Sequence, residues 1–276
     1  MQLATVRLGH STSAARRAGD ELVLLDYLDV GALLAHDNWY ERATADDARR
    51  IALDHTQLAP VIPRPNALVC VGLNYRSHIA EMGRDMPAHP TLFAKLPSAL
   101  IGACDDIELS SASSRWDWEA ELAVVVGSPL RNATAKQAQQ AIAGFCVAND
   151  ITARDWQKRT VQWFAGKNFE HTCPLGPFLV TGDEIDNAQD LALSCQVDGD
   201  MVQQARTSDL LFDPATVLAD LSVIMTLQPG DVVLTGTPSG VGDGRTPPRY
   251  LHAGHVVTTT IEGLGQCVNR CEVQRV

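Results

Sequence analysis

Residues 115–127 read RWDWEAELAVVVG, and this stretch decides the fold class. Its tail, ELAVVVG, is an apolar, valine-rich run that is typical of a buried β-strand. If the strand begins near Trp118, Glu119 and Glu121 lie two residues apart and point to the same face. Two neighbouring carboxylates repel each other. The stretch therefore indicates either a cation bound between them or an edge strand on which both face solvent.

A third oxygen ligand is available at the end of another predicted strand. The segment CVAND, residues 146–150, reads as a strand that runs into a turn, and functional side chains often sit at such ends. Mg²⁺ and Mn²⁺ prefer oxygen ligands, and three carboxylates leave coordination positions open for water and substrate. We therefore expect Glu119, Glu121 and Asp150 to bind Mg²⁺ or Mn²⁺, with solvent-facing glutamates as the alternative.

The rest of the chain alternates strand and helix signals without regular βαβ order. Strand patterns occur at residues 67–75, 230–238 and 255–263, and helical patterns at residues 77–82, 133–141 and 214–226. This mixture predicts an α+β fold, predominantly β, with a mostly antiparallel or mixed sheet.

The first 62 residues predict a small separate unit. Residues 4–8 and 21–27 read as two short strands joined by a polar, glycine-containing turn, and residues 43–58 read as a helix. Three prolines in residues 60–65 cannot continue a helix or a central strand. We therefore expect a small N-terminal α/β domain over residues 1–62 and a larger catalytic domain over residues 63–276.

Composition limits the classes of partner. The net charge of −11 and the lack of a basic stripe argue against nucleic acid. No apolar run approaches the roughly 20 residues that span a bilayer, and residues 1–27 lack the apolar core of a secretory signal. The seven cysteines are odd in number and scattered, as buried reduced thiols are. We expect a cytoplasmic protein with no nucleic-acid or membrane partner.

Six segments, in order, resemble the fumarylacetoacetate hydrolase family, in its acylpyruvate hydrolase-like branch. They are VGLNYRSH at 71–78 with Glu81; FAK at 93–95 with Ser98; DWEAEL at 117–122; NDITARD at 149–155; GK at 166–167 with CPLGP at 173–177; and LTGTP at 234–238 with GVG at 240–242. The chain departs from the family pattern at Asn168, directly after Lys167. This departure bears on the identity of the substrate more than on the metal chemistry.

The resemblance implies a fold, a site and an assembly. The fold is a rolled mixed β-sandwich or barrel after a small N-terminal domain, and the assembly is a homodimer. The metal ligands would be the three carboxylates named above. The remaining roles fall on catalytic residues (His78, Glu81 and Lys167) and on substrate-binding residues (Arg76, Arg154, Gln157 and Thr237).

The chemistry of these side chains agrees with such roles. His78 and Glu81 share one face of a helical turn, so Glu81 can orient the imidazole as a base; the alternative is an exposed pair. Lys167 lies among apolar residues and can stabilise an anionic oxygen, unless it is a surface lysine. Thr237 lies in a turn whose hydroxyl and N–H groups can hold a carboxylate, and the alternative is an ordinary turn hydroxyl.

The function implied by the resemblance is hydrolysis of the C–C bond of an acylpyruvate, a 2,4-dioxo acid such as a fumarylpyruvate-like compound, to pyruvate and a carboxylic acid. Such a reaction belongs in aromatic catabolism. The alternative on the same scaffold is an oxaloacetate decarboxylase or a 2-oxo diacid isomerase or tautomerase. A module that binds a metal or metabolite without catalysis would be expected to lack the histidine–glutamate pair or the lysine, and both are present.

Overall fold

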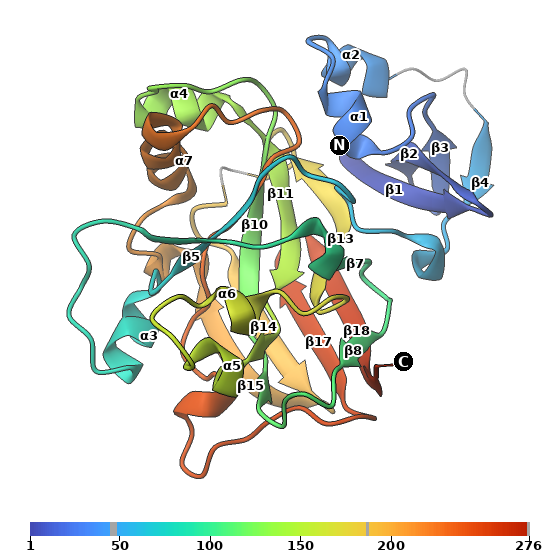
Figure 1. Cartoon of the computed structure of the whole chain (residues 1–276). Coiled ribbons are helices and arrows are strands. Elements are labelled where there is room, and N and C mark those ends of the chain that lie inside the picture. Colours follow the sequence, from blue (N-terminus) through green and yellow to red (C-terminus); the bar gives the residue numbers. More distant parts are fainter. Residues whose placement is uncertain (45–48, 186–187, 275–276) are drawn as a thin grey trace.

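The structure, a computed structural model, describes residues 1–44, 49–185 and 188–274. Strands dominate, as predicted, and the larger sheet runs through the whole molecule in the order β4-β3-β2-β1-β13-β11-β10-β16-β5-β6, with β7 beside β13. Figure 1 shows β10, β11 and β13 at its centre. Outside the N-terminal unit, the strands of this larger sheet are β5 (Leu68–Gly72), β6 (Thr91–Ala94), β7 (Leu100–Ile101), β10 (Ala120–Val126), β11 (Ile142–Asn149), β13 (Cys173–Thr181) and β16 (Val232–Leu234).

The N-terminal unit joins this sheet directly. Strand β1 pairs antiparallel with β13, with Gln2 opposite Val180 and Leu3 opposite Leu179, so hydrogen bonding continues across the boundary predicted at residue 62. The unit consists of β1 (Gln2–Leu8), β2 (Ser11–Ala18), β3 (Glu21–Leu24), β4 (Arg50–Ala52), α1 (Val30–Leu34), α2 (Trp39–Ala43) and the 3₁₀ helix η1 (His55–Gln57).

A second sheet packs beside the first in the order β15-β14-β17-β18-β8. It contains β8 (Ile107–Leu109), β14 (Ala192–Val197), β15 (Asp200–Arg206), β17 (Val256–Ile261) and β18 (Gly265–Val273). Two short strands, β9 (Trp116–Asp117) and β12 (Thr152–Ala153), pair with each other. The two main sheets agree with the rolled, mixed β architecture that the family resemblance implied.

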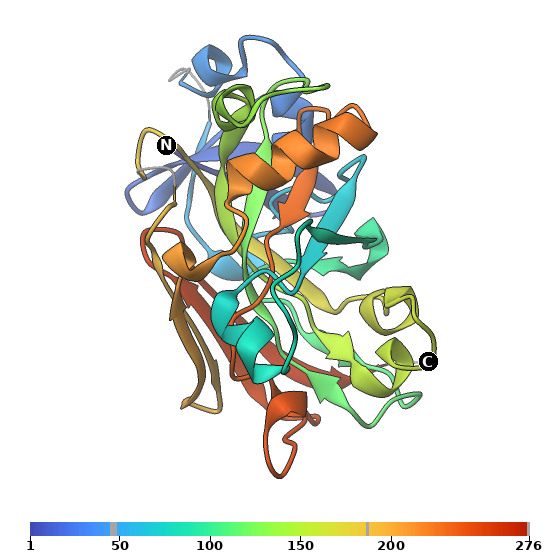
Figure 2. The same cartoon turned by 90° about the vertical axis from the view of Figure 1, so that its left-hand side faces the viewer.

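The helices are short and lie around the sheets. They are α3 (Arg76–Glu81), α4 (Ala135–Gln140), α5 (Arg154–Gln157), α6 (Phe164–Lys167) and α7 (Pro214–Ile224), with 3₁₀ turns η2 (Pro97–Ala99), η3 (Thr207–Asp209) and η4 (Gly242–Gly244). Figure 2 shows α4 beside α7 at one end of the molecule, and α3 and α5 nearer the other end. No helix in the described ranges has the length and apolar character needed to span a bilayer.

The core explains why β10 is apolar at every position except Glu121. Every residue of β10 is buried, and its side chains alternate between two apolar clusters. Leu122 and Val124 belong to one cluster, whereas Ala123 and Val125 belong to the other. A strand covered on both faces has no solvent-facing positions, so its sequence does not alternate between polar and apolar residues.

Two local predictions for the N-terminal unit were wrong. Residues 11–18, expected within a turn, form strand β2, and the helix expected over residues 43–58 is absent from its described part. Instead, β4 pairs with β3, and Asp54 accepts a hydrogen bond from the N–H of Thr56 at the start of η1. Residues 45–48 of that predicted helix lie outside the described residues. Pairing with an existing sheet edge outweighed the modest helix propensity of this segment.

Candidate active site

Strand pairing brings the three predicted metal ligands together. Strands β10 and β11 are antiparallel, with Glu121 opposite Ala148, and the N–H of Asp150 donates to the carbonyl of Glu119 at 2.8 Å. Glu119 lies just before β10 and Asp150 just after β11, so both carboxylates emerge at the same end of the pair. One oxygen from each of Glu119, Glu121 and Asp150 lies within 4.8 Å of the others, and all three residues are buried.

A buried amide holds this end of the strand pair. The side-chain oxygen of Asn149 accepts a hydrogen bond from the N–H of Glu119 at 2.9 Å, and its NH₂ donates to Thr259 Oγ1 at 2.8 Å. Asn149 thereby fixes the backbone between Trp118 and the start of β10, where the strand has not yet begun. The position of Glu119 depends on this contact as well as on strand geometry.

Two buried lysines neutralise part of the acidic cluster. Lys167 Nζ lies 2.5 Å from Glu119 Oε2 and 2.8 Å from Asp150 Oδ2, and Lys95 Nζ lies 2.7 Å from Asp150 Oδ1. Burial acts to raise the pKa of Asp150, but the charges and hydrogen bonds of Lys167 and Lys95 outweigh it and hold this pKa below its ordinary value. Burial acts to lower the pKa of Lys167, yet Asp150 and Glu119 raise it.

One carboxylate of the cluster has no ion-pair partner among the described residues. Glu121 accepts a hydrogen bond from the N–H of Gly236 at 2.6 Å and is 1% exposed. Burial and the negative charges of Asp150 and Glu119 raise the pKa of Glu121 well above its ordinary value. A divalent cation would supply the missing positive charge, and carboxylate oxygens suit Mg²⁺ or Mn²⁺. The residues present therefore fit such an ion.

Arg154 extends the cluster from α5. Its Nε lies 2.7 Å from Asp117 Oδ2, and its Nη1 lies 2.7 Å from Glu119 Oε1 and 3.0 Å from Gln157 Oε1. Its Nη2 is buried and has no hydrogen-bond partner among the described residues. Because an unpartnered buried donor is costly, and because Arg154 lines the cavity described below, this N–H group is suited to an anionic ligand.

A glycine turn positions Thr237 beside the cluster. Gly236 has φ +101°, and a Cβ there would approach the carbonyl oxygen of Val71 to 2.9 Å, so only glycine fits without displacement. The buried Thr237 Oγ1 accepts a hydrogen bond from Gln203 at 2.8 Å. The hydroxyl proton of Thr237 then remains free to donate to a ligand.

His78 and Glu81 form the predicted pair on α3. His78 Nδ1 lies 3.0 Å from Glu81 Oε2, and Glu81 Oε1 accepts from the N–H of Gly240 at 2.9 Å. Partial burial acts to raise the pKa of Glu81, but these hydrogen bonds and nearby positive charge lower it. Since an ionised carboxylate only accepts hydrogen bonds, Nδ1 carries the proton and Nε2 is left as the basic nitrogen.

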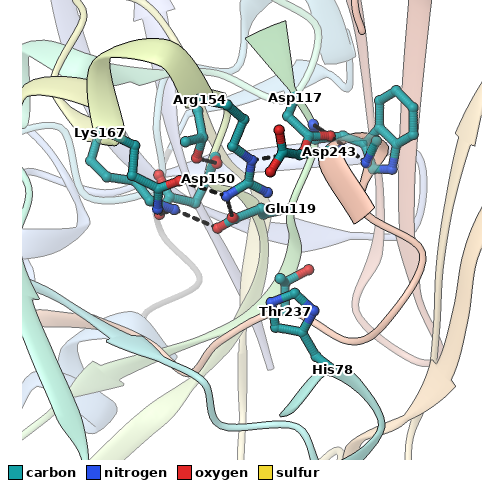
Figure 3. A network of polar contacts seen from close by, with 12 residues as sticks. His78, Asp117, Glu119, Asp150, Arg154, Lys167, Thr237 and Asp243 are labelled. Carbon is teal, nitrogen blue, oxygen red and sulfur yellow. Dashed lines mark hydrogen bonds and ion pairs between the residues drawn. The ribbon is translucent and has the colours of Figure 1, made fainter. Parts of the chain in front are cut away.

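Part of this network lines one cavity of about 430 Å³: Glu119, Glu121, Arg154, Lys167, Thr237 and His78. Figure 3 shows the cluster of Lys167, Asp150, Glu119 and Arg154 on one side, with His78 and Thr237 opposite. Gln157 also lines the cavity, whereas Arg76 does not: its guanidinium donates to the carbonyls of Asp209 and Leu210. The lining residues include Val71, His78, Phe93, Glu119, Glu121, Arg154, Gln157, Trp163, Lys167, Thr237 and Val241.

The same arrangement of segments occurs in known proteins. A family model described as fumarylacetoacetate (FAA) hydrolase, C-terminal, matches residues 67–272, which include every cavity-lining residue named above. The chain belongs to the fumarylacetoacetate hydrolase family. The resemblance seen in the sequence is thereby confirmed.

Relatives within the fumarylacetoacetate hydrolase family differ in reaction. Oxaloacetate tautomerase Fahd2a, a mitochondrial protein of Rattus norvegicus, is 44% identical over 216 residues, covering 78% of this chain and 69% of the relative. The solved fumarylacetoacetate hydrolase of Exiguobacterium antarcticum is 33% identical, with a TM-score of 0.88 over 99% of this chain and 100% of that chain. Fumarylpyruvate hydrolase of Pseudomonas aeruginosa, solved with Mn²⁺ and pyruvate, is 30% identical, with a TM-score of 0.69 over 79% and 92%.

Sequence reasoning missed two residues of this site. Lys95 was assigned no role in the site, yet its ammonium contacts Asp150 directly. Asp117 had no predicted role, yet its buried carboxylate accepts from Arg154 and from the N–H groups of Gly242 and Asp243. For Lys95 the available signal was a charged residue among apolar neighbours, and for Asp117 it was a carboxylate between two tryptophans, since buried charges are rarely left without partners.

Proposed function

We propose that the chain catalyses keto–enol tautomerisation of a 2-oxo dicarboxylate, and that oxaloacetate is the first substrate to test. The observation that carries the proposal is that the oriented base His78 lines one cavity together with Glu119 and Glu121, which form the acidic cluster with Asp150, and that His78 lies opposite Glu119 (Figure 3). Tautomerisation needs one base and a site for negative charge, and both are available. The 44% identity to an oxaloacetate tautomerase favours this alternative over the acylpyruvate hydrolysis that the sequence first suggested.

Substrate binding would use the donors that have no partner of their own. The free Nη2 of Arg154 and the hydroxyl proton of Thr237 would bind the carboxylate of the 2-oxo acid. Glu119, Glu121 and Asp150 would hold Mg²⁺ or Mn²⁺, and such an ion would supply positive charge that favours enolisation of a 2-oxo acid. Lys167 would add a second positive charge at this end of the cavity, where low exposure strengthens electrostatic interactions.

Proton transfer would pass through His78 Nε2. In the keto form, Nε2 would take a proton from C3, and the C–H electron pair would form the C2–C3 double bond while negative charge moves to the 2-oxygen. The imidazolium would then give that proton from Nε2 to the oxygen, which forms the enol and restores the neutral base, and the reverse sequence returns the ketone. Glu81 would stabilise the imidazolium through its hydrogen bond to Nδ1, which is a role that a fixed general base requires.

The proposal is tested by following enol oxaloacetate, freshly dissolved, through the loss of its ultraviolet absorbance. With Mg²⁺ present, we expect the protein to accelerate formation of the ketone without releasing pyruvate, and we expect a chelator to remove the acceleration. Glu119→Gln should lose it too, because it removes a ligand charge at the cluster. A rate equal to that of buffer alone, with cation present, would overturn the proposal.

Hydrolysis of an acylpyruvate is the second candidate, and the fumarylpyruvate hydrolase neighbour favours it. The same His78 Nε2 would then take a proton from water, and the resulting hydroxide would attack C4. Pyruvate formed from acetylpyruvate or fumarylpyruvate, measured under the same conditions, would identify this reaction. Pyruvate formed from oxaloacetate itself would instead identify a decarboxylase.

A further inference from the structure

The cavity has a buried floor and an exposed mouth. Glu119, Glu121 and Lys167 at the floor are at most 5% exposed, whereas Met82, Arg84, Lys158, Thr160 and Val161 line the same cavity and are exposed. The half-buried Phe93 and Trp163 also line it, and their rings meet edge to face at 5.5 Å. A ligand bound at the floor would therefore extend through an apolar middle toward polar groups at the mouth.

The cations along this path differ in whether a carboxylate already pairs with them. At the floor, Lys167 is paired with Glu119 and Asp150, and Arg154 with Asp117 and Glu119. At the mouth, Lys158 Nζ lies 2.5 Å from Asp243 Oδ2.

Arg84 is different. Its guanidinium has no ion pair or side-chain hydrogen bond within the part of the chain that the structure describes, although it lines the cavity. It is therefore the cation at the mouth that is available to an anionic ligand.

The backbone of Arg84 is fixed to the helix that carries His78. The N–H of Arg84 donates to the carbonyl of Ile79 at 3.1 Å, and the N–H of Gly83 donates to that of Ala80 at 3.0 Å. With φ +61° at Gly83, these bonds form a Schellman motif at the end of α3. The starting point of the Arg84 side chain is thus set by the same helical turn that orients the base.

We propose that Arg84 binds the carboxylate at the far end of the substrate, so that the site selects 2-oxo dicarboxylates over 2-oxo monocarboxylates of the same chain length. This inference rests on the proposed function, because it assumes that the 2-oxo acid end of the ligand lies at the floor. Arginine suits the task, since its planar fork can donate two parallel hydrogen bonds to one carboxylate. The apolar middle of the cavity would contact the carbon chain between the two ends.

The test uses pairs of 2-oxo acids that differ only in the far carboxylate. The dissociation constants of 2-oxoglutarate against 2-oxopentanoate, and of 2-oxoadipate against 2-oxohexanoate, are measured by calorimetry with Mg²⁺. We expect wild-type protein to bind the diacid about tenfold more tightly in at least one pair, which corresponds to about 1.4 kcal/mol. Arg84→Gln should reduce this preference to less than about twofold while leaving monoacid binding unchanged, and Arg84→Lys should retain part of it.

Arg270→Gln is the matched control, because Arg270 is an exposed arginine on β18 that pairs with Glu272 and does not line the cavity. It should keep the wild-type preference. If wild type binds diacid and monoacid equally in both pairs, or if Arg84→Gln keeps the preference, the inference is overturned while the proposed reaction is unaffected. If the preference depends on Arg84 but enol oxaloacetate is not converted, the carboxylate site stands and the proposed reaction fails. If none of the four 2-oxo acids binds, the inference is overturned, and the enol oxaloacetate assay decides the proposed reaction separately.

Discussion

The floor of the cavity and helix α3 differ in how firmly their side chains are held. On the floor, four carboxylates and three cationic side chains are buried together, and the three cations form ion pairs as short as 2.5 Å; their members are Asp117, Glu119, Glu121, Asp150, Lys95, Arg154 and Lys167. On α3, the base is held by one hydrogen bond to Glu81, and the helix is only six residues long. The buried cluster depends on ion pairs that match every charge except that of Glu121, whereas α3 can change with a small structural cost.

The largest effect is expected from Asp150→Asn, on the floor. This change removes the carboxylate between Lys95 and Lys167 and leaves two buried ammonium groups with less compensation. We expect the free energy of unfolding, measured with denaturant, to fall by about 3–5 kcal/mol, together with loss of turnover. Asp200→Asn is the control, because Asp200 pairs with Arg249 at an exposed position, and it should change stability by less than about 0.5 kcal/mol. A small effect at Asp150 would show that the floor tolerates unmatched charge.

An intermediate effect is expected from His78→Gln, on α3. The variant loses the basic nitrogen but keeps a polar side chain near Glu81. We expect the turnover rate to fall by about 10²–10⁴-fold, while the free energy of unfolding changes by less than about 1 kcal/mol. Stabilisation by Mg²⁺ in a thermal melt should persist, since His78 is not one of the three carboxylates. Loss of that stabilisation would mean that Mg²⁺ binding at the acidic cluster depends on His78 of α3.

The smallest effect is expected from Gly83→Ala, at the end of α3. Alanine in the left-handed conformation costs about 1–2 kcal/mol, and nothing lies within 4 Å of the added Cβ. Gly19→Ala is a matched control, since Gly19 has φ +67° and equally open space. Both variants should lose similar stability in denaturant titrations, but only Gly83→Ala should also weaken the preference for diacids. If both variants show the same preference for diacids, the binding of a carboxylate by Arg84 does not depend on the backbone conformation at the end of α3.

The sequence predicted those parts of the site that depend on local pattern. The strand pattern of residues 121–127 and the strand end at Asp150 led to the acidic cluster, whereas the pair His78–Glu81 came from the family resemblance, with which the three-residue spacing agrees. The contacts of Lys95 and Asp117 were not predicted, because they join residues 55 and 37 positions away in the chain. Such contacts depend on the packing of sheets and loops, which local pattern does not determine. For the same reason, the continuation of the sheet through β1 was not predicted.

Strand β1 covers one side of β13, and this has a consequence for experiments on fragments. The ammonium group of Met1 also contacts Asp183 and Glu184, just beyond β13, so the first residue is anchored to the larger domain. A fragment beginning at residue 63 would present β13 with a row of free N–H and C=O groups. Such an edge is a template for pairing with other chains, and we expect this fragment to self-associate through it.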